Sequence, residues 1–92
     1  MMIKKGRKKG TVRFVYTAEN GASDVAVAGD FTGWEPVGMK KQRGGTYAVT
    51  LEVSPGEHEY RLVVDGLWMA DPDHHDRVPN PFGSVNSVVQ AP

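Results

Sequence analysis

The chain has 92 residues, no cysteine, and 11 basic and 11 acidic residues, so its formal net charge is zero. This length predicts one domain with one modest core. The composition excludes a disulfide framework and a thiolate zinc site, and a neutral balance does not favour a polyanionic partner such as nucleic acid.

The first strand is predicted to begin at Thr11, and the segment before it is basic. Five of the 11 basic residues lie between Lys4 and Lys9. We therefore expect residues 1–10 to form a disordered tail and residues 11–92 a single module. The tail lacks the apolar stretch of a secretory signal, and no segment approaches the roughly 18 apolar residues of a membrane span. Together with the absence of cysteine, this favours a cytoplasmic protein with no membrane partner.

Short strands with a period of two dominate the rest of the chain. In the first of them Val12, Phe14 and Tyr16 share one face, which is typical of a half-buried strand. The predicted strands, in chain order, are Thr11–Thr17, Val25–Gly29, Val37–Lys41 (an edge strand), Thr46–Val53, His58–Val64, Leu67–Met69 and Ser84–Gln90.

Turn signals separate these strands. Asp65-Gly66 is a two-residue hairpin turn of a type that suits positive φ. Ser54–Glu57 places proline and then glycine at its two central positions. Other turns or loops are predicted at residues 19–21, 30–36 and 42–45, and a long polar loop at Asp71–Pro81. About seven short strands with no helical period predict an all-β fold, a β-sandwich.

Four sequence motifs occur in a fixed order. They are Gly29–Trp34 (GDFTGW), Pro55–Trp68 (PGEHEYRLVVDGLW), Asp71-Pro72, and Phe82–Ser87 (FGSVNS). Together they resemble the glycogen-binding module family, which includes the module of the AMP-activated protein kinase β subunit and the N-terminal modules of isoamylases and glycogen branching enzymes. The resemblance covers nearly all of residues 12–90. It implies an immunoglobulin-like, early-set β-sandwich, in agreement with the strand count.

The resemblance also implies a function, the non-catalytic binding of α-1,4-linked glucans such as glycogen, starch, maltooligosaccharides and cyclodextrin. Trp34 and Trp68 occupy the family's two stacking positions. An exposed indole offers a flat apolar surface to the C–H face of a sugar ring. The alternative for each tryptophan is a place in the core, since tryptophan is highly buried on average.

Four further residues match the family's sugar contacts. Arg61 stands where the family commonly has a lysine, and its planar fork differs from an ammonium group. The amide of Asn86 both donates and accepts, and Ser84 adds a shorter contact. Phe82 stands where the family often has leucine, and it either adds contact area or fills the edge of the core.

Two other functions, metal binding and catalysis, have weaker support in the sequence. The cluster Asp71, Asp73, His74, His75 and Asp76 contains metal-ligand types, but a zinc site needs three or four convergent ligands. We expect a solvated polar loop, no metal and no cofactor. No motif places two carboxylates across a glycosidic bond, and there is no phosphate-binding loop or Ser-His-Asp signature, so we expect no catalytic residues.

The expected partner is therefore an α-glucan polysaccharide or oligosaccharide. The alternative is a protein-interaction or regulatory module that docks on a separate glycogen- or starch-active enzyme, with weak or no sugar binding. We expect no nucleic-acid partner, because the net charge is zero; binding of nucleic acid through Lys4–Lys9 would show as an affinity that falls steeply with salt. The expected assembly is a monomer or a weak homo-oligomer.

Overall fold

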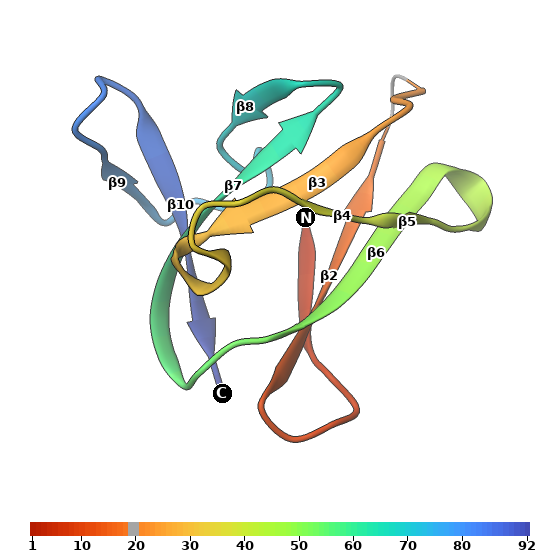
Figure 1. Ribbon diagram of the computed structural model, residues 1–92, viewed down its shortest axis with the longest axis horizontal. Coiled ribbons are helices and arrows are strands. Elements are labelled where there is room, and N and C mark those ends of the chain that lie inside the picture. The colour runs from red at the N-terminus through yellow and green to blue at the C-terminus, as the bar shows by residue number, and fades with distance from the viewer. Residues whose placement is uncertain (19–20) are drawn as a thin grey trace.

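The computed structural model describes residues 1–18 and 21–92, and the chain forms two antiparallel sheets packed as a sandwich (Figure 1). The first sheet has the strand order β1 (Met2–Lys5), β2 (Thr11–Thr17), β6 (Thr46–Glu52) and β5 (Lys40–Lys41). The second has the order β4 (Val37–Gly38), β3 (Val25–Gly29), β7 (Gly56–Val64), β10 (Val85–Ala91) and β9 (Arg77–Pro79), and β8 (Leu67–Met69) pairs with β7. The predicted all-β sandwich is confirmed, and the fold is compatible with an immunoglobulin-like one.

The core lies between the two sheets and follows the period of two. On β2, Val12 and Phe14 are buried while Arg13 between them is exposed. The ring of Phe14 stacks on Phe31 at 5.6 Å and meets Tyr60 of β7 at 6.1 Å. Alternation along β7 therefore turns one set of its side chains toward the core and the other set outward.

The expectation of a disordered tail at residues 1–10 differs from the structure, in which residues 2–5 form β1 beside β2. Ile3 lies opposite Phe14, so an apolar side chain supports the pairing, and Met1 is buried. Lys4 lies opposite Arg13 and is exposed. Among the basic residues of this segment, Ile3 is the residue of β1 that packs against the core, and one apolar position gave no recognisable pattern.

The predicted edge strand at Val37–Lys41 is wrong in one respect, because the segment forms two short strands in different sheets. β4 pairs with β3, and β5 pairs with β6. Met39 lies between them, is buried, and donates its N–H to the carbonyl oxygen of Val25 at 2.8 Å. The chain therefore crosses from one sheet to the other at this buried residue.

Two turn predictions have different outcomes. The Asp65-Gly66 hairpin is confirmed, with φ values of 49° and 84° that fit a turn with positive φ at both central residues. The turn predicted at residues 19–21 includes Glu19 and Asn20, which lie outside the described residues. The predicted long loop at Asp71–Pro81 contains the short strand β9 at its end, which pairs with β10.

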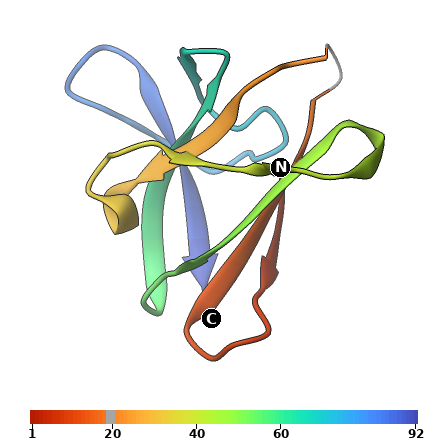
Figure 2. The same ribbon diagram turned by 45° about the vertical axis from the view of Figure 1, so that its right-hand side comes forward.

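The neighbour of β7 on one side changes along its length. Glu57 to Tyr60 pair with β10, whereas Leu62 to Val64 pair with β8. The β7–β8 and β9–β10 hairpins project on the same side of the molecule (Figures 1 and 2). Arg61 lies on β7 at the point where the two hairpins part.

Candidate functional site

A hollow of about 500 Å³, here called the groove, lies on the outer face of the second sheet. Its floor comes from β7, where Glu59 and Arg61 alternate with the buried Tyr60 and Leu62. The residues that line it are Asp30, Trp34, Glu59, Arg61, Trp68, Asn80, Pro81, Phe82 and Asn86. The structure thus brings together five of the six residues singled out in the sequence. Ser84 does not line the groove.

The two tryptophans lie in the groove and not in the core. Trp34 is 39% exposed and Trp68 is 41% exposed. Trp68 stands on β8 opposite Val63, on the same face of the sheet as Arg61. Both indoles therefore keep an apolar surface in contact with solvent.

Trp34 has an unusual backbone conformation. It lies just after the 3₁₀ turn η1 (Asp30–Thr32). Its φ is 63°, in the left-handed region that residues other than glycine rarely adopt. Gly33 before it has the same φ of 63°, and the N–H of Trp34 donates to the carbonyl oxygen of Gly29 at 2.9 Å. This hydrogen bond closes the loop and fixes where the indole leaves the backbone.

Arg61 lies on the groove floor and is tied to its wall. Its Nη2 donates to the carbonyl oxygen of Trp68 at 3.2 Å. Its Nε is buried and has no hydrogen-bond partner among the described residues. A buried donor of this kind raises the free energy of the unliganded protein.

Asn86 lines the groove, but its amide is already engaged within the protein. Its Nδ2 donates to Oε1 of Glu59 at 3.0 Å, and its Oδ1 accepts from Nδ2 of Asn80 at 3.1 Å. The Oδ1 of Asn80 in turn accepts the N–H groups of Phe82 and Ser84 at 3.0 and 3.2 Å. A chain of side-chain hydrogen bonds therefore runs from the floor of the groove to its outer loop.

Phe82 sits at the tip of that loop and is 92% exposed, so it does not fill the edge of the core. Ser84 follows it, half-buried, with its N–H bonded to Asn80. An apolar ring left this far in water contributes little to folding. An exposed aromatic ring at the rim of a groove with two indoles is typical of a binding surface.

Sequence reasoning missed four lining residues, Asp30, Glu59, Asn80 and Pro81, as members of the site. Glu59 carried a usable signal, since the period of two places it on the same face as Arg61. Asp30 is part of the Gly29–Trp34 motif. No pattern pointed to Asn80, which lies between two prolines in the loop after β9.

Asp30, His58 and Ser54 have the order of contacts of a catalytic triad but not its chemistry. The Nδ1 of His58 lies 2.6 Å from Oδ1 of Asp30, and its Nε2 lies 2.7 Å from the carbonyl oxygen of Ser54 and 3.3 Å from the Ser54 hydroxyl. The short contacts of the two ring nitrogens with a carboxylate oxygen and a carbonyl oxygen, neither of which can donate, favour a ring protonated on both nitrogens, an imidazolium. An imidazolium has no lone pair with which to take a proton from serine.

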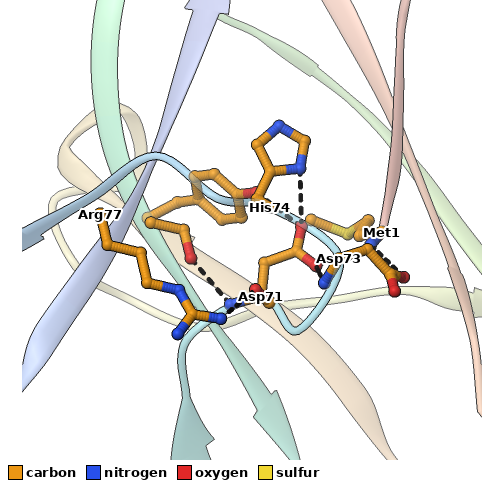
Figure 3. Close-up of polar contacts among 7 residues, drawn as sticks. Met1, Asp71, Asp73, His74 and Arg77 are labelled. Atoms are coloured by element: carbon orange, nitrogen blue, oxygen red, sulfur yellow. Dashed lines mark hydrogen bonds and ion pairs between the residues drawn. The ribbon is translucent and has the colours of Figure 1, made fainter.

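Asp71, the first residue of the acidic and histidine-rich loop, has a structural role. Asp71 is fully buried, where a solvated loop was expected, and Oδ1 accepts from the Met1 ammonium at 2.6 Å (Figure 3). Its Oδ2 accepts from the hydroxyl of Tyr60 at 2.6 Å. Burial and the Asp71 carboxylate raise the pKa of Tyr60. The Met1 ammonium lowers the pKa of Asp73.

The described part of the chain contains neither a cluster of metal-ligating side chains nor a membrane-spanning helix. In residues 1–18 and 21–92, no group of three or more histidine, aspartate and glutamate side chains is placed to hold a metal ion. Within the same residues, no helix is long and apolar enough to cross a membrane.

Comparison with known proteins shows related sequences in animals and plants. The 5'-AMP-activated protein kinase subunit beta-1 of Sus scrofa is 30% identical over 76 residues, which cover 83% of this chain and 61% of that protein. Protein PTST homolog 2, chloroplastic, of Arabidopsis thaliana is 41% identical over 54 residues, covering 58% of this chain and 10% of that protein. The chain therefore spans only part of the length of these curated relatives.

A solved structure shares the fold of the chain, and a family model matches most of its sequence. A crystal structure of a proposed alpha amylase from Salmonella typhimurium superposes with a TM-score of 0.70 at 22% identity, covering 95% of this chain and 14% of that one, which shows the shared fold. The family model described as the glycogen recognition site of AMP-activated protein kinase matches residues 11–92. The resemblance inferred from the four motifs is thereby confirmed, and the chain belongs to this glycogen-recognition family of carbohydrate-binding modules.

Proposed function

We propose that the chain binds α-1,4-linked glucans in the groove, without catalysing a reaction on them. The observation that carries the proposal is the pairing of Trp34 and Trp68, each about two-fifths exposed, on one hollow whose floor is polar. Stacking of successive sugar rings would remove both indoles from water while the hydroxyl groups of the sugars meet polar side chains. Phe82 at the rim would cover a further sugar face.

The polar contacts divide into two kinds. Arg61 is proposed to donate to sugar hydroxyls, and a ligand that drew its guanidinium outward would give its orphaned Nε a partner. Asn86 would act together with Glu59, because its amide is already bonded to that carboxylate. Ser84 is proposed to bind at the rim beside Phe82, outside the groove proper.

The proposal includes no catalytic step. Both carboxylates that line the groove hold protein groups in place, Asp30 on His58 and the N–H of Glu59, and Glu59 on Asn86. Each neutral hydrogen bond contributes roughly 0.5–1.5 kcal/mol net. With two stacked rings and the cost of ordering the sugar, we expect a Kd of order 10 μM to 1 mM. A module of this affinity would act through local concentration.

The test is a titration with β-cyclodextrin or maltoheptaose, followed by tryptophan fluorescence and amide NMR shifts. We expect saturable shifts at Trp34, Trp68 and Asn86 that barely change between low and high salt, because the ligand is neutral. A steep loss with salt would point instead to a polyanionic ligand. Absence of any shift up to about 10 mM ligand would refute the proposal and leave docking on a separate glycogen- or starch-active enzyme as the alternative.

A further inference from the structure

His58 lies next to the loop that carries Trp34, and its hydrogen bonds join two separate segments. On one side is Asp30, the first residue of η1; on the other is the carbonyl oxygen of Ser54, in the turn between β6 and β7. The side chain of His58 is only 15% exposed. A single imidazole thus bridges η1 to a turn that is more than twenty residues further along the chain.

The bridge reaches Trp34 through Asp30. The second carboxylate oxygen of Asp30 accepts the N–H of Glu59 at 2.9 Å, so the side chain spans from η1 to β7. Between Asp30 and Trp34 the chain makes one 3₁₀ turn and enters the left-handed region at Gly33 and Trp34. A backbone in that conformation is held by its surroundings, and a change at Asp30 is expected to alter the orientation of the indole.

We propose that His58 is a positioning residue for the groove: as an imidazolium it holds Asp30 and the Trp34 loop in place, and glucan affinity falls when it loses its proton. A neutral imidazole can donate from only one nitrogen, so deprotonation breaks either the bond to Asp30 or the bond to the Ser54 carbonyl oxygen, which leaves only the longer 3.3 Å contact with the Ser54 hydroxyl on that side. The part that concerns affinity rests on the proposed function. The part that concerns the loop does not.

Asp30 is the ionisable side chain that contacts the imidazole of His58. The ring also meets the edge of Phe31 at 5.8 Å, and its cross-strand neighbour on β10 is Val89. Its neighbours on β7 are acidic, but their carboxylates accept from amides of β10: Glu57 from Gln90 and Glu59 from Asn86.

The direction of the pH effect follows from these contacts. Burial lowers the pKa of His58, but the hydrogen bonds to Asp30 and to the Ser54 carbonyl, with the negative charge of Asp30, outweigh it and raise the pKa above 6.5. A pKa raised in the folded state means that the bridge is complete below about pH 6.5, the ordinary value for histidine, and is lost as the pH rises through the folded value. The sensitive range therefore lies above pH 6.5.

The experiment follows the ring nitrogens of His58 and the amide and indole signals of Trp34 by NMR from pH 5.5 to 9, first without ligand. We expect both His58 nitrogens to be protonated at pH 6 and the Trp34 signals to shift with the same midpoint as His58. The Kd for β-cyclodextrin is then measured over the same range. We expect it to weaken roughly three- to tenfold across that midpoint, the effect of losing one charge-assisted hydrogen bond at a partly exposed site.

Two variants separate this device from a general pH effect. His58→Gln is expected to bind more weakly than wild type at pH 6 and to lose the pH dependence, whereas His75→Gln, in an exposed loop, keeps it. A neutral His58 at pH 6, Trp34 signals that ignore its titration, or an unchanged pH profile in His58→Gln would overturn the inference. If Trp34 follows His58 but no glucan binds at any pH, the positioning role stands and the proposed function fails.

Discussion

Replacement of Trp68 by alanine isolates the contribution of one stacking surface to binding. The side chain is 41% exposed in the free protein. For a tryptophan of roughly 250 Å², that leaves about 100 Å² open, and covering about half of it is worth about 1.2 kcal/mol at roughly 25 cal/mol per Å². The apolar face of the sugar loses a comparable area, so the total is about 2.4 kcal/mol. We therefore expect Trp68→Ala to weaken β-cyclodextrin binding roughly 50-fold.

The matched control is Leu67→Ala, on the neighbouring residue of the same short strand. Leu67 is 72% exposed, points to the opposite face of β8 and does not line the groove. Isothermal titration calorimetry on wild type and both variants gives the affinities, and thermal melts show whether each variant folds. Equal affinities for wild type and Trp68→Ala would refute the stacking argument. So would a loss in Leu67→Ala as large as the loss in Trp68→Ala.

Three further predictions concern the frame around the groove. Gly29→Ala places a Cβ 2.6 Å from a ring atom of η1 and 2.7 Å from a carbonyl oxygen of β7, so we expect a lower melting temperature and weaker glucan binding, whereas Gly38→Ala, with open space, changes neither. Tyr60→Phe leaves Oδ2 of the buried Asp71 with only the 3.5 Å contact to Nδ1 of His74 and should cost about 1–3 kcal/mol in chemical denaturation, with β-cyclodextrin affinity unchanged. Phe82→Ala should change stability by no more than about 0.5 kcal/mol yet weaken binding in calorimetry, since the ring is 92% exposed at the groove rim; an unchanged affinity would remove Phe82 from the site.

The strands with a clear period of two were predictable because burial on one face leaves a repeating mark in the sequence. Thr11–Thr17 is such a case, and its bounds agree with β2. β1 was not predictable in this way, because four residues with two lysines carry little pattern and its support comes from Phe14 across the sheet. The buried carboxylate of Asp71 is bonded to the ammonium group of Met1 and to the hydroxyl of Tyr60, 70 and 11 residues away, which no local pattern records.

The site divides in the same manner. Trp34 and Trp68 were found through motifs. Trp34 lies in the loop that follows β3, Trp68 lies on β8, and the groove lies between them because β3 and β8 pair with opposite sides of β7. Glu59 was within reach of the alternation that placed Arg61. The internal bonds of Asn86 were not, since they depend on Asn80 in a loop whose path the sequence leaves open. The family motifs thus predicted five of the nine residues that line the groove, but not which of them are already bonded to each other.

Hydrogen bonds within the protein also hold the walls of the groove in place without a ligand. A loop ordered only on binding would cost the complex the entropy of fixing its backbone and side chains. Here Trp34 is held by its N–H bond to Gly29, and the opposite loop by the bonds that Asn80 accepts. The left-handed backbone at Trp34 is a strained conformation, and the stability of the fold offsets the free energy of that strain. In the proposed glucan complex, two walls fixed in advance would leave the ordering of the sugar chain as the main entropic cost of binding.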